Sequence, residues 1–126
     1  MPGTKRGCCS PKPDLRHRAL LDDGQVGGLR ELFKVLANDT RLRILHALVR
    51  SEELRVTELA ATVGMKPQAV SNQLQRLSAT GILGCRRDGN NIFYRITDPC
   101  AASLLDTSLC LLEDAGKLKS RRRRTA

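Results

Sequence analysis

The residues of this chain best suited to chemistry are its five cysteines. Cys8 and Cys9 are adjacent near the start, Cys85 stands alone, and Cys100 and Cys110 lie close to the end. Thiolate sulfur is a soft ligand that favours Hg(II), As(III), Cd(II), Pb(II) or Cu(I) over Co(II) or Ni(II). An odd number of cysteines and a polar start without a signal peptide argue against structural disulfides, because the cytoplasm keeps thiols reduced. The cysteines therefore predict either a thiophilic metal or metalloid site or a thiol redox sensor.

Cys100 and Cys110 are predicted to lie on the same helix. Asp98 is a good N-cap and Pro99 suits the first helical position, so a helix is expected over residues 99–115. The two cysteines are separated by ~15 Å along such a helix, so one chain cannot place both thiols on one ion. If two of these helices pack antiparallel in a dimer, Cys100 of one copy falls beside Cys110 of the other.

The remaining cysteines offer further ligands. Cys8 and Cys9 lie in residues 1–22, a proline-containing stretch predicted to be a flexible arm, which could fold over to complete a trigonal or tetrahedral thiolate site. Cys85 falls on a predicted strand, where it is either a further ligand or a small apolar side chain in the core. No nucleophile–base pair or nucleotide-binding loop accompanies the thiols, so no enzymatic activity is predicted.

Residues 56–77 predict a short helix, a tight turn and a second helix. Thr57 is expected to cap the first helix, Gly64 allows the sharp turn, and Pro67 suits the first turn of the second helix. The apolar positions of the second helix recur at helical spacing and face the core: Val70, Leu74 and Leu77. Amide, hydroxyl and basic side chains that can contact DNA lie on the rest of this segment: Lys66, Gln68, Ser71, Asn72 and Gln75.

Residues 84–96 predict a β-hairpin with a basic arm and a polar tip. A helix-turn-helix followed by such a hairpin indicates a winged helix, a mainly α fold that places one helix in the major groove of DNA. The hairpin side chains expected on the flanking phosphates or in the minor groove are Arg86, Arg87, Asn90 and Asn91. Earlier in the chain, helices are expected over residues 25–37 and 41–50. The second of these would turn four side chains inward: Leu42, Leu45, Leu48 and Val49.

The net charge of +9 is unevenly distributed. Six of the excess positive charges lie in the predicted basic, disordered tail, residues 117–126, which adds nonspecific attraction to phosphate. Between the arm and the tail, residues 23–116 are predicted to form one DNA-binding and dimerisation domain. No apolar run approaches the ~18 residues that span a bilayer, so no membrane partner is expected and a cytoplasmic location is predicted.

Three segments resemble the ArsR/SmtB family of winged-helix repressors. Residues 31–45, ELFKVLANDTRLRIL, are similar to the family signature LFKALADPTRLRIL. Residues 70–74 resemble its VSxHL recognition helix, with Gln73 in place of the histidine, and residues 86–96 resemble its wing. The resemblance runs from about residue 29 to 114. It implies a homodimer with four helices, two strands and a final helix, dimerised through the first and last helices and bound to double-stranded operator DNA.

The resemblance also bears on the ligands. The family's thiolate site on the first helix of the helix-turn-helix is absent, because residues 53–59 contain no cysteine, and its site in the recognition helix is absent too. The family's zinc sensor on the final helix combines Asp-x-His with a later His and Glu across the dimer. Asp98 and Cys100 match the first pair and Asp114 matches the Glu. Cys110 lies one residue before the later His position, which Leu111 occupies.

These patterns give one hypothesis and two alternatives. The hypothesis is a repressor of a resistance operon that leaves its operator on binding Hg(II), As(III), Cd(II) or Pb(II). A repressor of the same fold that senses oxidants or persulfides through its thiols is the first alternative. A constitutive DNA-binding protein with incidental cysteines is the second.

Overall fold

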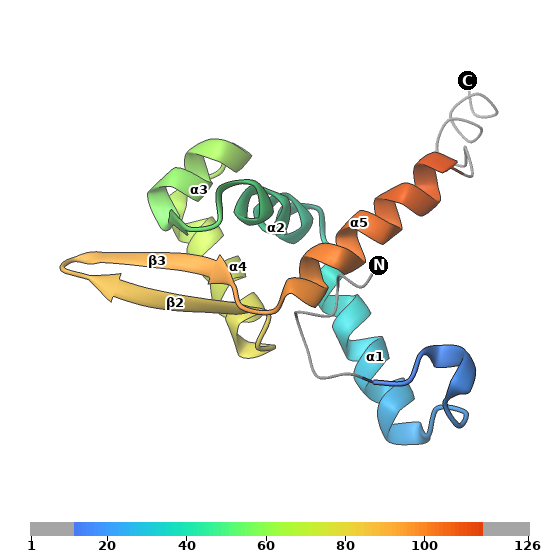
Figure 1. Ribbon diagram of the computed structural model, residues 1–126. Helices are drawn as coiled ribbons and strands as arrows, with labels where there is room; N and C mark the ends of the chain where they lie inside the picture. Colours follow the sequence, from blue (N-terminus) through green and yellow to red (C-terminus); the bar gives the residue numbers. More distant parts are fainter. Residues whose placement is uncertain (1–11, 115–126) are drawn as a thin grey trace.

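The computed structural model describes residues 12–114 of the chain. Its helices are α1 (Asp23–Leu36), α2 (Asp39–Ser51), α3 (Val56–Val63), α4 (Pro67–Ala79) and α5 (Pro99–Asp114), after a short 3-10 turn at Leu15–His17. Its strands are β1 (Leu54–Arg55), β2 (Leu83–Asp88) and β3 (Asn91–Ile96). This order is that of a winged helix-turn-helix, so the predicted mainly α fold is confirmed (Figure 1).

The sheet contains one strand that the sequence did not predict. Its order is β1-β3-β2, all antiparallel, with Leu54 opposite Tyr94 and Leu83 opposite Ile96. The two-residue strand β1 is too short to show an alternating pattern. It joins the end of α2 to the hairpin and leads directly into α3.

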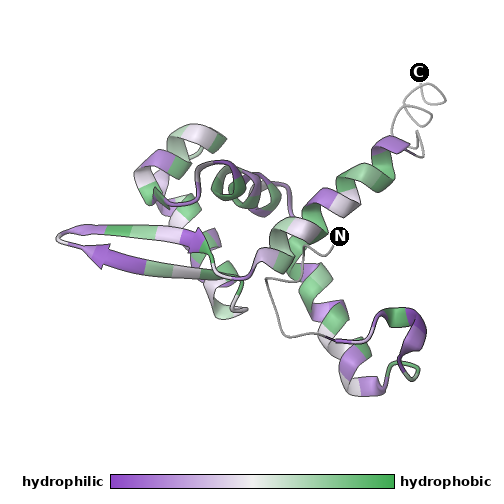
Figure 2. Cartoon of the chain, viewed as in Figure 1, coloured by the Kyte–Doolittle hydropathy of each residue, from purple (hydrophilic) through white to green (hydrophobic). Residues whose placement is uncertain are grey.

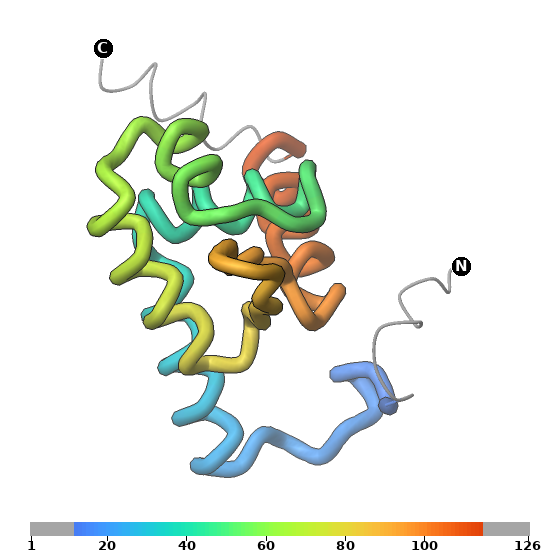
Figure 3. Tube along the Cα trace, turned by 90° about the vertical axis from the view of Figure 1, so that its left-hand side faces the viewer, coloured from blue at the N-terminus to red at the C-terminus, as the bar shows by residue number. Residues whose placement is uncertain are grey.

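The core lies where α2, α3 and α4 meet the base of the sheet. Its most deeply buried side chains are Ile44, Leu45, Leu48, Leu59, Val70, Leu74 and Leu77. The prediction for α2 was wrong at two positions, since Leu42 is 38% exposed and Val49 is 43% exposed. Ile44 occupies the core instead, because the inward face of α2 is rotated toward α3 and α4. Figure 3 shows α4 running along one side of the molecule from the end of α3 toward the hairpin.

Helix ends account for most of the boundaries. Asn38 caps α2 by accepting from the backbone N–H of Arg41, and Gly64 ends α3 with a left-handed φ of 71°. Thr57 was wrongly predicted as the N-cap of α3. The helix begins at Val56, after Arg55 leaves the sheet, and Glu58 accepts from the Arg55 backbone N–H at 2.8 Å.

The first and last helices bury little of their surface within one chain. Only Leu36 of α1 and no residue of α5 is buried. Exposed apolar side chains lie on both helices: Val26, Leu29, Phe33, Leu109, Leu111 and Leu112. In Figure 1 the far half of α5 extends beyond the body on the side opposite the hairpin, and Figure 2 shows apolar residues continuing along it. Within residues 12–114 no helix is long and apolar enough to cross a membrane.

Candidate nucleic-acid interface and inducer site

The predicted recognition helix presents its polar residues outward. Pro67 occupies the first position of α4, and the core-facing side chains hold the opposite face of the helix against α2 and α3. Of the predicted DNA contacts on this segment, Lys66, Gln68, Asn72 and Gln75 are exposed and Ser71 is half-buried. The Gln68 Nε2 donates to Asn72 Oδ1 at 3.3 Å, which aligns two amides one turn apart. Such amides can form paired hydrogen bonds with adenine edges in the major groove.

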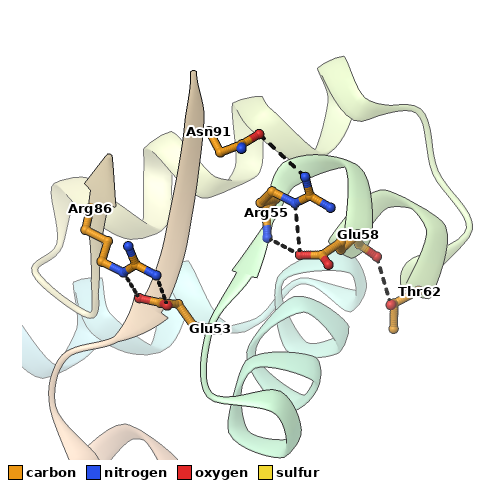
Figure 4. A network of polar contacts seen from close by, with 6 residues as sticks. All are labelled: Glu53, Arg55, Glu58, Thr62, Arg86 and Asn91. Carbon is orange, nitrogen blue, oxygen red and sulfur yellow. Dashed lines mark hydrogen bonds and ion pairs between the residues drawn. The ribbon is translucent and has the colours of Figure 1, made fainter. Parts of the chain in front are cut away.

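Arg86 of the wing already has partners inside the chain. Its Nε and Nη2 both donate to the carboxylate of Glu53, each at 2.8 Å (Figure 4). Its guanidinium also lies 4.5 Å from the centre of the Phe93 ring. The hydrogen bond from Arg86 lowers the pKa of Glu53. A bidentate pair of this kind fixes orientation, so Arg86 anchors the wing to the end of α2. The wing residues Arg87 and Asn90 are exposed.

A second contact ties the wing to α3. The Arg55 Nη1 donates to Asn91 Oδ1 at 3.5 Å, and Arg55 Nε lies 3.4 Å from Glu58 Oε1 (Figure 4). Hydrogen bonds from Arg55 lower the pKa of Glu58. Asn91, predicted as a DNA contact, therefore also joins the hairpin to the helix-turn-helix. Sequence reasoning missed Glu53 and Arg55, because their partners are more than thirty residues away.

The predicted ligands separate into several places. Cys8 and Cys9 lie outside the described residues, as do the predicted tail and the end of the predicted final helix. Cys85 is exposed on β2, opposite Tyr94, so the alternative that it fills the core is wrong. Tyr94 packs partly against the core, whereas Cys85 itself faces solvent. Asp98, Cys100, Cys110 and Asp114 all belong to α5 or its cap.

A cysteine and an aspartate lie together at each end of α5. At the start, Asp98 caps the helix, and its Oδ1 accepts from the Cys100 backbone N–H at 2.9 Å. Asp98 and Cys100 also line a hollow of about 200 Å³ between α1 and α5. At the other end, the Cys110 thiol donates to Asp114 Oδ2 at 3.2 Å. This hydrogen bond, with some desolvation and the negative charges of Glu113 and Asp106, raises the pKa of Cys110.

Neither pair is a complete metal site within one chain. No group of three or more His, Cys, Asp or Glu side chains that could hold a metal ion occurs within residues 12–114. Both cysteines are exposed and lie in no disulfide. At about 100° per residue, Cys100 and Cys110 lie about 80° apart around the helix and share one sector with Asp114. Ser103 and Thr107, both exposed and small, lie between them on that sector. This face leaves room for close approach by another helix.

The comparison with known proteins agrees with the fold. A family model described as a helix-turn-helix domain matches residues 36–86. The HTH-type transcriptional regulator KmtR of Mycobacterium tuberculosis is 36% identical over 106 residues, which cover 84% of this chain and 81% of that protein. The chain belongs to the ArsR/SmtB family of metal-responsive winged-helix repressors. It is a transcriptional regulator and not an enzyme.

Two solved structures are similar throughout the domain. The antimony-specific transcriptional repressor AntR is 60% identical, with a TM-score of 0.73 over 86% of this chain and 98% of that chain. The homodimeric winged helix-turn-helix domain Mb0332 from Mycobacterium bovis, a possible ArsR-family regulator, is 29% identical. Its TM-score is 0.68 over 78% of this chain and 93% of that one. Homodimeric DNA-binding domains thus occur among the relatives, as the prediction for this family required.

Proposed function

We propose that two copies of this chain bind operator DNA as a dimer and leave it when a thiophilic metal or metalloid ion joins their final helices. The α4 residues Lys66, Gln68, Ser71, Asn72 and Gln75 would contact the major groove. The wing residues Arg87, Asn90 and Asn91 would contact flanking phosphate or the minor groove, and Arg86 would set the angle of the wing. The observation that carries this proposal is that each end of α5 has an exposed cysteine beside an aspartate, joined through the Cys100 backbone N–H at one end and the Cys110 thiol at the other.

The surfaces that one chain leaves uncovered support the proposed dimer. Phe33 on α1 is 51% exposed and Leu111 on α5 is 59% exposed. Exposed apolar side chains gathered on two terminal helices are typical of an interface between subunits. Antiparallel packing of α5 on α5, with the twofold axis between Ser103 and Thr107, would place Cys100 of one copy beside Cys110 of the other. Two equivalent sites would result.

The ligand chemistry selects the inducer class. Each site would combine Cys100 and Cys110 from different chains with the carboxylates of Asp98 and Asp114, and the Cys8–Cys9 arm would supply further thiolates. Sulfur ligands favour As(III), Hg(II), Cd(II) and Pb(II), and the 60% identity with AntR adds Sb(III). Cys85, which lies apart on the wing, is the least supported of the candidate ligands.

Binding of an ion at Cys110 requires loss of the thiol proton. The Asp114 hydrogen bond raises the pKa of Cys110, and thiolate is both the metal ligand and the species that attacks an oxidant. A metal ion can displace that proton as it binds. Joining the two α5 helices would then fix a dimer geometry in which the α4 helices no longer match the operator spacing. A coupling of about 3 kcal/mol weakens DNA binding more than 100-fold.

A titration of the reduced full-length protein tests the proposal. We expect a thiolate-to-metal absorption band and release of labelled operator with Sb(III), As(III), Hg(II) or Cd(II), and little response to Ni(II) or Co(II). Cys100→Ser and Cys110→Ser should each abolish release while operator binding is retained. A mixed dimer with one substitution in each chain should recover one site. Release by peroxide or polysulfide without a response to these ions would contradict the proposal and favour the redox alternative.

Operator binding needs its own control. Asn72→Ala should lower affinity for operator more than affinity for scrambled DNA, because it removes a base contact. Removal of residues 121–124 should weaken both DNAs alike and flatten the salt dependence of binding. Equal losses on both DNAs for Asn72→Ala would contradict the assignment of α4 as the helix that reads bases.

A further inference from the structure

Arg41 is the one buried charged residue within residues 12–114. Only 8% of its surface is exposed, although it stands near the start of α2. Its Nε donates to Gln73 Oε1 on α4 at 2.7 Å, and its Nη1 donates to the backbone oxygen of Val35 at 2.8 Å. One guanidinium therefore joins three helices: the end of α1, the start of α2 and the middle of α4.

The environment of Arg41 is unusual because its hydrogen-bond partners are neutral oxygens. A buried charge is costly unless its hydrogen bonds are satisfied. The Val35 oxygen lies in the last turn of α1, where the carbonyl groups lack helical partners and the helix dipole is negative. Gln73 supplies the second oxygen. The backbone at Arg41 is itself held by the Asn38 cap, whose Oδ1 lies 3.0 Å from the Arg41 nitrogen.

The planar guanidinium fork sets the distance between its two acceptors. Gln73 is next to Asn72 in the sequence. The Gln73 side chain is half-buried on the inner side of α4, and the Asn72 side chain is exposed on the outer side of the same helix. A displacement of the Gln73 side chain would rotate or translate the same turn of α4 that carries the predicted base contact. The preceding turns of α1, where Leu29 is 41% exposed and Phe33 is 51% exposed, belong to the uncovered surface that the proposed dimer would bury.

We infer that Arg41 is a positioning residue for operator recognition, holding the outer face of α4 at a fixed place relative to α1. This inference rests on the proposed function, in which α4 reads the operator. Through this contact, a change in the position of α1 at the dimer interface reaches the base-reading turn without passing through the wing. Gln73 is the acceptor that makes the connection specific to α4.

Substitutions at both ends of the contact test the inference in the full-length dimer. We expect Arg41→Met and Gln73→Leu each to lower the ratio of operator to scrambled-DNA affinity about tenfold, the size of one hydrogen bond to a charged group. The double variant should lose little more than either single variant, because the two residues act through one contact. Gln73→Glu keeps an acceptor oxygen and should retain the wild-type ratio. Arg43→Met, which removes an exposed charge from the same helix, is the matched control and should leave the ratio unchanged.

Circular dichroism at the assay temperature separates folding from positioning. If Arg41→Met does not fold, Gln73→Leu and Gln73→Glu carry the test, because both keep the contact between Arg41 and Val35. Folded Gln73→Leu with a wild-type ratio, or additive losses in the double variant, would overturn the inference. Asn72→Ala measured in parallel distinguishes failure of this inference from failure of the proposed function. If it lowers the ratio while Gln73→Leu does not, the inference alone fails, and if it has no effect, the proposed function of α4 fails as well.

Discussion

Gly84 stands at the point where the hairpin meets the start of α5, and it has no room for a side chain. A Cβ atom at this position would lie 2.6 Å from Thr97 Cγ2. Thr97 cannot easily turn away, because its Oγ1 donates to the backbone oxygens of Gly81 and Ile82 at 2.9 and 3.1 Å. Gly84→Ala must therefore push Thr97 and the strand apart or break these hydrogen bonds. Either response should cost about 1–3 kcal/mol of unfolding free energy.

The compensating change tests this reasoning directly. Thr97→Ser removes Cγ2 and keeps Oγ, so the double variant Gly84→Ala with Thr97→Ser should recover most of the lost stability. The free energies of unfolding come from urea titration followed by circular dichroism, with Thr97→Ser alone as the control. A loss of 1 kcal/mol corresponds to roughly 4–8 °C in Tm for a domain of this size. A neutral Gly84→Ala, or a double variant no more stable than Gly84→Ala, would show that the close contact does not limit this position.

Three other changes have defined outcomes. Asp114→Asn should lower the pKa of Cys110 by removing the carboxylate that stabilises the thiol, and iodoacetamide should then alkylate Cys110 faster at neutral pH, as measured by mass spectrometry. Glu53→Gln should lower Tm at neutral pH but less in acid. The pKa of Glu53 is lowered in the folded state by its pairing with Arg86. That pairing therefore stabilises the fold at pH values above the unfolded-state pKa, and the stabilisation is lost as the pH falls through the folded-state pKa. Gly28→Ala should stabilise the protein by about 0.5–1 kcal/mol in thermal unfolding, because Gly28 lies within α1 with nothing near its missing side chain.

Local signals predicted the helices well because their ends are chemically marked. Asn38, Gly64 and Pro67 perform in the structure the capping and turning roles that their types indicate. The errors arose where tertiary contacts determine the start of a helix or its buried face. Thr57 is an adequate cap by type, but pairing of β1 with β3 moved the start of α3 two residues earlier. The inward face of α2 was misjudged because its apolar residues surround most of the helix, and only packing against α3 and α4 selects Ile44.

The parts of the candidate site that depend only on spacing along one helix could be predicted from the sequence. The ten-residue separation of Cys100 and Cys110 placed them at opposite ends of α5, and the Asp98 cap was readable from the sequence. The exposure of Cys85 could not be predicted from the sequence, because alternation along a strand does not reveal where a hairpin leaves the body of the domain. Burial of Arg41 was also unreadable, since an arginine in a helical pattern is ordinarily placed on the solvent side.

Under the proposed function, the location of the thiols on α5 would require two copies of the chain to complete one ion site. Each end of α5 offers one thiol and one carboxylate, too few donors to hold a soft ion tightly, and the two ends are too far apart to share one. A second α5 running antiparallel would supply the missing thiol at both ends simultaneously. Ion binding would then depend on the same helix pairing that sets the distance between the two α4 helices. In the proposed dimer, an ion that completes this site would be linked to operator binding through that shared interface.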